Sequence, residues 1–401
     1  MKIALVAPFC SLPNEPHFNR FQYLAQLLSQ THEVVLITSQ FKHYDKTFRT
    51  PDSAHTPPDS RLSIRLLPER GYQKNVSVAR LISHHDFVQA LAAEVQTWQV
   101  GEFDVVYSAY PLMGSNLVLG KHKARLGYRL IIDVQDVWPE SFSAVCSLIK
   151  KLPPRLLPFA ARANRAYAYA DGLVAVSRTY LQRALQANPA AKDYSAVVYI
   201  GADVASIDNS KAVAFVGNKT RFFYFGTLSY SYDMATVCQG IQQMVANGQN
   251  VALHIMGGGP DLAKLKAYES EHIIFHGFVP YERMMALAKG CDIAINPIHA
   301  HAAQTITNKL SDYMVLQKPI LNSQVGEEVA EVLSLIGHQN YRSGDVDDFI
   351  RAANALINNP TPAPHTAEIL CRFQRDWAYP VLQQLIERVA QMPTPSVSLK
   401  K

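Results

Sequence analysis

The sequence predicts an α/β protein of two domains, each built on a parallel sheet, and three observations support this prediction. A chain of 401 residues is longer than one core usually allows, which favours two domains of about 150–200 residues. Short runs rich in β-branched residues alternate with segments of helical period, as expected for parallel sheets covered by helices on both faces. The strand pattern also starts afresh after the polar stretch 203–219, which has the composition of a linker. We therefore expect domains at 1–203 and 204–372 with a ligand cleft between them, and a C-terminal helix and tail at 373–401.

The individual strands follow from short apolar runs bounded by turn residues. Those expected in the first domain are Lys2–Ala7, Glu33–Ser39, Leu62–Pro68, Asp104–Ala109, Arg129–Val134, Gly172–Ser177 and Ala196–Gly201. Those expected in the second are Arg221–Gly226, Val251–Gly257, His272–Gly277, Asp292–Pro297 and Pro319–Asn322. Phe87, Leu91 and Val95 recur at helical spacing, which predicts an amphipathic helix that faces a core.

Composition and charge exclude several classes of protein. A hydrophobic content of 48% argues against disorder, and a net charge of +5 is too small to indicate nucleic acid, although it permits contact with anionic lipid. The five cysteines lie far apart without a C-x-x-C pair, which favours buried thiols in a reducing compartment over disulfides or a zinc site. No stretch approaches the roughly 20 apolar residues of a membrane span. We therefore expect a cytoplasmic protein.

A glycine run after a predicted strand indicates close approach of a ligand to the backbone. Gly257-Gly258-Gly259-Pro260 follows a buried strand and precedes a helix, where amides and a helix N-terminus are able to meet a phosphate, although the same pattern also occurs in plain turns. The turn after the first strand, residues 8–13, lacks G-x-G-x-x-G, which disfavours a nicotinamide enzyme. His276-Gly277-Phe278-Val279 ends another strand in a tight loop suited to main-chain contacts with a nucleobase.

A lysine and a carboxylate three residues apart begin a later helix. Lys309 and Asp312 share one face of the segment Thr307–Met314. A lysine beside a helix N-terminus suits a diphosphate, and the carboxylate one turn further on suits ribose hydroxyls. The alternative is a surface ion pair of little energetic weight.

The order of these motifs resembles the donor-binding domain of retaining glycosyltransferases of family four, which have the GT-B fold of two Rossmann-like domains facing across a cleft. The resemblance rests on "FFYFGTLSYSYDM", "ALHIMGGGPDLAKL", "IIFHGFVP", "CDIAINP" and "TNKLSDYMVLQKPIL" and covers residues 221–322, with "VVYIGADV" similar to the strand before the family's linker. It also implies that the C-terminal helix crosses back to the first domain. The motif set looks like the branch that acts in capsule and surface-polysaccharide synthesis.

The resemblance implies a nucleotide-sugar site whose residues are found by motif. Donor-binding roles fall on Gly226, Thr227, Ser229, Tyr230, Gly258, Gly259, Phe278, Val279, Asn308, Lys309 and Asp312. Typical members carry an arginine after the first glycine and a lysine a few residues on, where this chain has Thr227 and Ser229–Asp233, and they carry two glutamates where this chain has Gln304 and Asp312. We therefore expect Lys309 to supply the main phosphate charge, with the hydroxyls of Thr227, Ser229 and Tyr230 assisting, and we count Lys309 among the catalytic candidates.

Two carboxylates close a strand of the first domain. The segment Asp133-Val134-Gln135-Asp136-Val137-Trp138-Pro139-Glu140 is similar to the family's D-x-x-D-x-W-P-E, which lies near the acceptor and the reacting sugar carbon. Asp136 is the first catalytic candidate and Glu140 the second, for acceptor positioning or charge stabilisation. The alternative for Asp136 is a capping carboxylate.

Basic residues near the first two strands are candidates for acceptor binding. His17 and Arg20 start the first helix, and Lys42, His43 and Lys46 cluster in a loop after the second strand, although a plain solvated loop has the same composition. Residues 148–165 mix leucines with cations, which suits either an anionic membrane surface or a helix packed inward with solvated lysines.

The function expected from these features is transfer of a hexose or N-acetylhexosamine from a UDP-linked or other nucleotide sugar to a lipid-linked or polysaccharide acceptor. The donor is a co-substrate, and we expect no cofactor and no metal, because Asp345-Val346-Asp347-Asp348 precedes a helix and is predicted to cap it. The expected location is cytoplasmic and peripheral, at the inner face of the plasma membrane. Two alternatives are a non-catalytic nucleotide-sugar-binding partner and a GT-B-shaped sugar-nucleotide epimerase or hydrolase.

Overall fold

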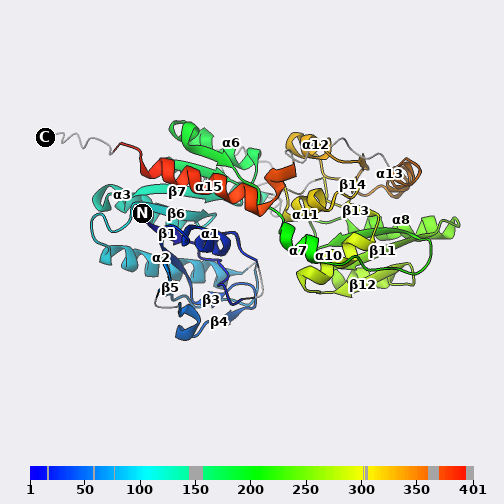
Figure 1. Cartoon of the computed structure of the whole chain (residues 1–401), viewed down its shortest axis with the longest axis horizontal. Helices are drawn as coiled ribbons and strands as arrows, with labels where there is room; N and C mark the ends of the chain where they lie inside the picture. Colours follow the sequence, from blue (N-terminus) through cyan, green and yellow to red (C-terminus); the bar gives the residue numbers. More distant parts are fainter. Residues whose placement is uncertain are drawn as a thin grey trace. The chain divides into compact units, whose positions relative to one another are not determined.

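The computed structural model describes residues 1–15, 18–56, 59–75, 77–143, 157–300, 302, 306–359 and 370–393. The chain divides into two compact units, Met1–Val198 with Tyr379–Lys401 and Tyr199–Ala378 (Figure 1). The unit boundaries thus fall five residues before and six residues after the domain limits expected at 203 and 372. The second boundary lies inside a single helix, α15 (Arg375–Ala390).

The first unit is built on a parallel sheet of seven strands in the order β5-β2-β1-β6-β7-β8-β9. The strands are β1 (Lys2–Val6), β2 (Glu33–Ser39), β5 (Leu62–Leu67), β6 (Val105–Tyr110), β7 (Arg129–Val134), β8 (Gly172–Ala175) and β9 (Ser195–Val197). The strand order reverses between β1 and β6, and such a switch point opens a crevice at the carboxyl ends of the strands. A separate antiparallel ribbon, β3 (Phe41–Lys42) with β4 (Thr47–Phe48), follows β2.

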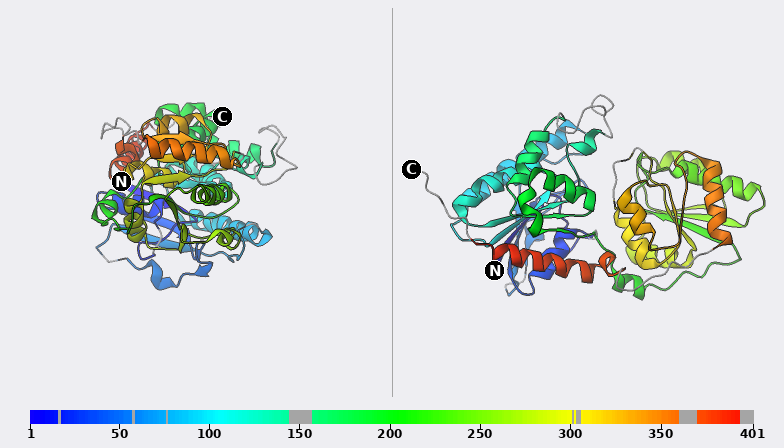
Figure 2. Two further views of the ribbon diagram at one scale, coloured as in Figure 1. Left: turned by 90° about the vertical axis from the view of Figure 1, so that its right-hand side faces the viewer. Right: turned by 90° about the horizontal axis from the view of Figure 1, so that it is seen from above.

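Helices cover both faces of this sheet (Figure 2). They are α1 (Arg20–Leu28), α2 (Val78–Thr97), α3 (Met113–Leu126), α4 (Glu140–Ser143), α5 (Ala160–Ala168), α6 (Arg178–Ala187) and the later part of α15, with 3-10 turns η1 (Pro51–Ala54) and η3 (Pro189–Tyr194). Asn19, Ser77 and Ser177 cap the starts of α1, α2 and α6 with their side-chain oxygens. α15 packs on α1, where the rings of Tyr23 and Tyr379 lie 4.8 Å apart.

The second unit repeats the same plan with the order β12-β11-β10-β13-β14-β15. Its strands are β10 (Thr220–Phe225), β11 (Val251–Met256), β12 (Ile273–Gly277), β13 (Ile293–Asn296), β14 (Ile320–Asn322) and β15 (His338–Asn340). Its helices are α7 (Val204–Asn209), α8 (Met234–Ala246), α9 (Leu262–Leu265), α10 (Tyr281–Gly290), α11 (Asn308–Leu316), α12 (Glu327–Leu333) and α13 (Val346–Asn358), with η4 (Lys266–Tyr268) and η5 (Cys371–Phe373). The switch point here lies between β10 and β13.

The alternation of side chains along β10 explains how one strand serves two layers. Phe222 and Tyr224 belong to the core cluster that includes α8 and α13. Phe223 and Phe225 point the other way and meet the ring of Tyr313 in α11 at 5.4 and 4.9 Å. Successive residues of a strand face opposite sides of a sheet, so an aromatic run of this kind predicts a strand buried on both faces.

The predicted strands are confirmed, with ends that agree within four residues. Sequence patterns missed β15, whose residues His338–Asn340 carry no apolar signal at the edge of the sheet, and the two-residue strands β3 and β4. The stretch expected as a linker contains α7, which Asp203 caps by accepting a hydrogen bond from the amide of Ser206. Asp345 caps α13 as predicted, with its side chain 2.9 Å from the amide of Asp348.

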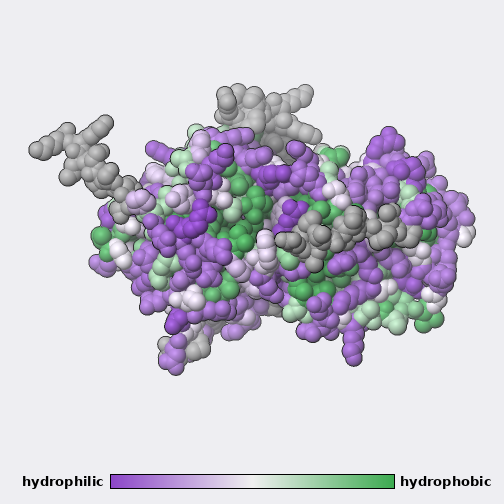
Figure 3. Space-filling view, turned by 45° about the horizontal axis from the view of Figure 1, so that its top comes forward, coloured by the Kyte–Doolittle hydropathy of each residue, from purple (hydrophilic) through white to green (hydrophobic). Residues whose placement is uncertain are grey.

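Within the described residues, every helix falls short of the length and apolarity needed to cross a bilayer. The face drawn in Figure 3 is mostly hydrophilic, with hydrophobic residues gathered in smaller patches.

A buried ion pair ties α1 to the first sheet. Arg20 Nε lies 2.6 Å from Asp133 Oδ2 at the end of β7, and Arg20 Nη1 donates to the carbonyl of Val198 at 2.8 Å. The hydroxyl of Tyr107 in β6 donates to the same carboxylate oxygen at 2.7 Å. Arg20 was expected to bind an acceptor; the structure instead buries its guanidinium in the interior of the unit.

Removal of one partner leaves the other charge buried, so Arg20→Met is expected to lower the free energy of unfolding by about 3–5 kcal/mol. The double variant Arg20→Met/Asp133→Asn should regain part of this loss, because no charge then stays in the core and Tyr107 keeps an acceptor. Urea unfolding followed by tryptophan fluorescence measures both. Equal stability of wild type and Arg20→Met would show that the pair contributes nothing.

Candidate functional site

The strongest candidate site lies at the carboxyl ends of β10, β11 and β13 in the second unit, at its switch point. Three glycines there have left-handed backbone angles, with φ of +125° at Gly226, +128° at Gly257 and +150° at Gly259. A Cβ atom on Gly257 would lie 2.1 Å from the carbonyl oxygen of Gly226, and one on Gly259 would lie 2.3 Å from that of Leu228. The turns after β10 and β11 therefore touch backbone to backbone, which only glycine permits.

Gly258 differs from its neighbours because a Cβ atom there would meet nothing within 4 Å among the described residues. Its carbonyl accepts a hydrogen bond from the amide of Leu228 at 2.8 Å. The glycine run thus has two parts: Gly257 and Gly259 hold the two turns together, and Gly258 borders open space that a ligand can enter.

Lys309 is a buried cation at the start of α11. Its side chain is 8% exposed, and Nζ lies 3.8 Å from the ring centroid of Tyr232 and 5.1 Å from that of Tyr224. A Cβ atom on Gly226 would come within 2.9 Å of Nζ, so the glycine also makes room for this side chain. Burial lowers the pKa of Lys309 from 10.5 to about 7, although the Asp312 carboxylate opposes the shift. Aromatic faces give the ammonium group some compensation for its lost hydration.

Asp312 lies one turn further along α11 and is also buried. Its Oδ1 accepts a hydrogen bond of 2.7 Å from the hydroxyl of Tyr281 at the start of α10. Burial raises the pKa of Asp312 to about 6, against the stabilising effect of Tyr281, Arg375 and Lys309 on the carboxylate. Because Lys309 and Asp312 are both buried, the alternative of a surface ion pair is wrong.

The N-terminus of α11 offers further polar atoms. Thr307 occupies the N-cap position with no side-chain capping bond. The hydroxyls of Thr307 and Ser311 are buried and have no hydrogen-bond partner among the residues that the structure describes. Buried polar groups are nearly always satisfied, so unpaired donors at a helix N-terminus suit an anion with several acceptor oxygens. The next residue, Asn308, is exposed.

The other predicted donor residues lie at the surface of this unit. Thr227 and Tyr230 are exposed and Ser229 is half-buried in the turn after β10. Phe278 is 71% exposed and Val279 is half-buried after β12. Gln304 lies outside the described residues.

An amide network that sequence patterns did not reveal lies at the ends of β13 and β14. Asn296 Nδ2 donates to Asn322 Oδ1 at 2.8 Å and to Gln324 Oε1 at 3.0 Å, and Asn322 Nδ2 donates to Asn340 Oδ1 at 2.8 Å. The signal was present in the sequence, since asparagines stand at or next to the ends of two successive predicted strands, Asp292–Pro297 and Pro319–Asn322.

In the first unit, Asp136 is engaged by its own loop. Its Oδ1 accepts from the amide of Val137 and its Oδ2 from the indole of Trp138, both at 2.8 Å. Burial raises the pKa of Asp136. Glu140 forms an ion pair with Arg183 of α6. Asp136 is thus bonded within the turn that follows β7, and Glu140 links the start of α4 to α6.

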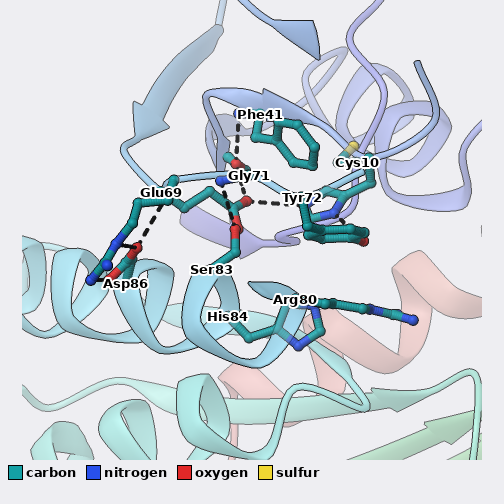
Figure 4. A network of polar contacts seen from close by, with 12 residues as sticks. Cys10, Phe41, Glu69, Gly71, Tyr72, Arg80, Ser83, His84 and Asp86 are labelled. Carbon is teal, nitrogen blue, oxygen red and sulfur yellow. Dashed lines mark hydrogen bonds and ion pairs between the residues drawn. The ribbon is translucent and has the colours of Figure 1, made fainter. Parts of the chain in front are cut away.

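A polar network centred on Glu69 lies in the same unit (Figure 4). Glu69 accepts hydrogen bonds from Ser39 and from Ser83 of α2, and its Oε1 lies 3.0 Å from His43 Nε2. The other ring nitrogen of His43 lies 2.9 Å from the hydroxyl of Tyr72. Burial lowers the pKa of His43, and the hydrogen bond and charge of Glu69 oppose this shift.

Arginine, lysine and a second histidine surround this network. Arg80 Nε donates to His84 Nε2 at 3.3 Å, and Lys46 Nζ lies 4.3 Å from the ring centroid of Tyr72 and donates to Asn75 at 2.8 Å. Lys42 pairs with Asp45 at 3.5 Å. The loop that was expected to bind the acceptor is thus partly buried and hydrogen-bonded. The alternative interpretation, a plain solvated loop, is therefore wrong for His43. Glu69, Tyr72 and His84 were missed, although an acid directly after the predicted strand Leu62–Pro68 was visible.

Two further expectations fall outside the described residues. These are the acceptor role of His17 and the amphipathic character of residues 148–156 within the basic segment 148–165.

Comparisons with known proteins bear on the family and on the fold. Residues 219–359 match the family model described as Glycosyl transferases group 1. A search of curated protein sequences gives no significant match.

Solved structures share the fold over nearly the whole chain. The lipopolysaccharide outer core galactosyltransferase WaaB in its apo form is 17% identical, with a TM-score of 0.61 over 97% of this chain and 99% of that one. Anabaena HepE in complex with UDP and glucose is 15% identical, with a TM-score of 0.64 over 98% and 100%. The UDP-GlcNAc 2-epimerase of Methanocaldococcus jannaschii is 12% identical, with a TM-score of 0.56 over 97% and 100%. The chain therefore has the GT-B fold of two Rossmann-like units, as predicted.

The bond between Tyr281 and Asp312 is open to a direct test. In Tyr281→Phe the carboxylate loses its hydroxyl donor, so the pKa of Asp312 should rise above its value of about 6. Carbon-detected NMR titration of the side-chain carboxyls measures this shift, with Tyr268→Phe as the control. An unchanged titration of Asp312 would mean that the hydroxyl does not stabilise the charged form.

Proposed function

We propose that the protein is a retaining glycosyltransferase of family four that uses a nucleotide sugar, most simply a UDP-linked one. It would move a hexose or N-acetylhexosamine to a lipid-linked or polysaccharide acceptor in surface-polysaccharide biosynthesis. The observation that carries this proposal is Lys309, buried at a helix N-terminus beside glycine turns, with a pKa near 7. Such a cation has lost its hydration, and a diphosphate would return a strong partner to it.

The donor would be held by groups with separate tasks. Lys309 Nζ and the first amides of α11 would bind the diphosphate, with Asn308 and the hydroxyls of Thr227, Ser229 and Tyr230 in place of the missing basic pair. Asp312 would accept hydrogen bonds from the ribose. Gly226, Gly258 and Gly259 would border the sugar and phosphates, and Phe278 and Val279 would contact the base.

In the proposed transfer the bond between the anomeric carbon and the phosphate oxygen breaks while the acceptor oxygen bonds to the same face of the sugar. The acceptor proton passes to the departing phosphate oxygen, so no protein base is consumed. Lys309 would stabilise the negative charge that develops on the leaving group. Asp136 and Glu140 would position the acceptor, with His43, Lys42 and Lys46 contributing on the same unit.

Three accompanying features belong to the same proposal. The reaction would proceed without a metal or a cofactor. The protein would act in the cytoplasm, peripherally at the inner face of the plasma membrane. Its partners would be the donor, the acceptor and anionic lipid, and not nucleic acid.

A donor screen tests the central claim. Three proteins are compared: the wild type, Lys309→Met and the surface control Lys211→Met. Calorimetry measures the binding of UDP-, GDP-, dTDP- and CMP-sugars, and a product assay measures their turnover, each with and without EDTA. One nucleotide sugar should bind, the affinity should fall about 10- to 100-fold in Lys309→Met alone, and EDTA should change nothing. Methionine fills the buried site of Lys309 without the charge of the lysine, so the variant is expected to fold. Thermal unfolding checks this.

Other outcomes would redirect the assignment. Binding without turnover in the presence of candidate acceptors favours a non-catalytic partner. Conversion of the sugar without an acceptor favours an epimerase or hydrolase. Absence of binding at millimolar donor contradicts the proposal.

Donor affinity should depend on pH in a narrow window. Above about pH 7 free Lys309 loses its proton, whereas the bound diphosphate would hold it, so binding takes up a proton and the Kd rises about tenfold per pH unit. Below about pH 6 Asp312 is protonated and loses acceptor capacity for ribose. Calorimetry in buffers of different ionisation enthalpy should show proton uptake near pH 8. A Kd that is flat from pH 6 to 8.5 would contradict a titrating lysine in the site.

A further inference from the structure

A pocket of about 230 Å³ lies in the first unit between α2, the start of α3 and α5. Its walls are largely apolar and include Leu81 and Val88 of α2, Met113 of α3 and Phe159 before α5. Leu81 is 62% exposed and Phe159 is 59% exposed, so large apolar side chains also lie at the rim. Exposed apolar surface next to a pocket usually marks a binding site.

The pocket adjoins the carboxyl ends of β6 and β7, where sheets of this type bind ligands. Trp138 lines it and donates its indole hydrogen to Asp136, the acceptor-positioning candidate. His84 also lines it, and the His84 ring lies 6.3 Å from that of His43 in the Glu69 network. The apolar space therefore opens toward the groups proposed to handle the acceptor.

The charge around the pocket is one-sided. Arg162 and His85 are exposed in its lining, and among the described residues that form it none is acidic. Arg162 makes no ion pair with any described residue. An occupant that is apolar along one part and anionic at one end would satisfy both features.

We propose that this pocket binds the apolar chain of an acceptor that is a lipid phosphate, with Arg162 facing its anionic group. The inference rests on the proposed transfer reaction and names the acceptor class. It distinguishes a lipid-linked acceptor from a free polysaccharide, which has no long apolar segment to bury.

Chain length is the sharpest probe of such a pocket. For n-alkyl phosphates of two to twelve carbons, affinity should rise about fourfold per added methylene and then level off when the pocket is full. Quenching or shift of Trp138 fluorescence reports binding, and Trp138→Phe removes the signal. Alkanols of the same length should show the same slope but bind about tenfold more weakly, because they lack the charge that Arg162 meets.

Two pairs of variants separate the apolar and the ionic contributions. Leu81→Glu places a carboxylate at the rim and should weaken alkyl phosphates at least tenfold, whereas Val100→Glu, also at an exposed site but outside the lining, should not. Arg162→Gln should reduce alkyl phosphate binding about tenfold and leave alkanols unchanged. Arg125→Gln on α3 is its control.

The readouts keep this inference apart from the transferase proposal. Leu81→Glu should retain nucleotide-sugar binding and lose transfer to a lipid-phosphate acceptor. If alkyl phosphates show no dependence on chain length, the lipid inference fails whatever the donor screen gives. The chain could also dimerise through this face. In that case Leu81→Glu changes the mass of the protein in solution and leaves ligand binding unchanged. The occupant is then a second copy of the chain, and the inference also fails.

Discussion

Loss of hydration at Lys309 is the constraint on which the candidate site depends. An ammonium group inside a protein must be compensated or neutralised. Here the two tyrosine rings and the Asp312 carboxyl compensate the charge of Lys309 incompletely, and its pKa is lowered to about 7. The glycine at the end of β10 leaves room for the side chain, and the aromatic strand beneath holds the helix that carries it. The buried charge of Lys309 thus lowers the stability of the fold and at the same time favours the binding of an anion.

The first unit has the same kind of parallel sheet as the second, but its charged groups are arranged differently. Arg20 and Asp133 form an ion pair in the interior, and Glu69 accepts hydrogen bonds from two hydroxyls and lies beside a histidine. What it leaves open at the carboxyl ends of its strands is a largely apolar pocket with an exposed arginine, Arg162, in its lining. Two copies of one architecture consequently offer two kinds of chemistry at the carboxyl ends of their strands.

Sequence patterns predicted most of the fold because buried parallel strands such as β1 and β10 contain continuous apolar runs with clear ends. They failed at β15, which is three polar residues long, and at α7, whose capping aspartate lies in a stretch too polar to suggest a helix. For the site, Lys309 and Asp312 were identified by spacing, but their burial was not, since burial depends on Tyr232 and Tyr281 from other elements. Arg20 was assigned to a ligand because its partner lies 113 residues away in the sequence.

The backbone contact between the glycine turns also limits how this protein can evolve. Gly257 and Gly259 admit no side chain, so selection for a new substrate has to act on the surrounding loops. Thr227, Ser229 and Tyr230 belong to the turn after β10, where Thr227 and Tyr230 are exposed and Ser229 is half-buried. A mutant library confined to such positions would vary donor recognition and keep the backbone contact between the turns, and relatives of this chain should show the same division between invariant glycines and variable neighbours.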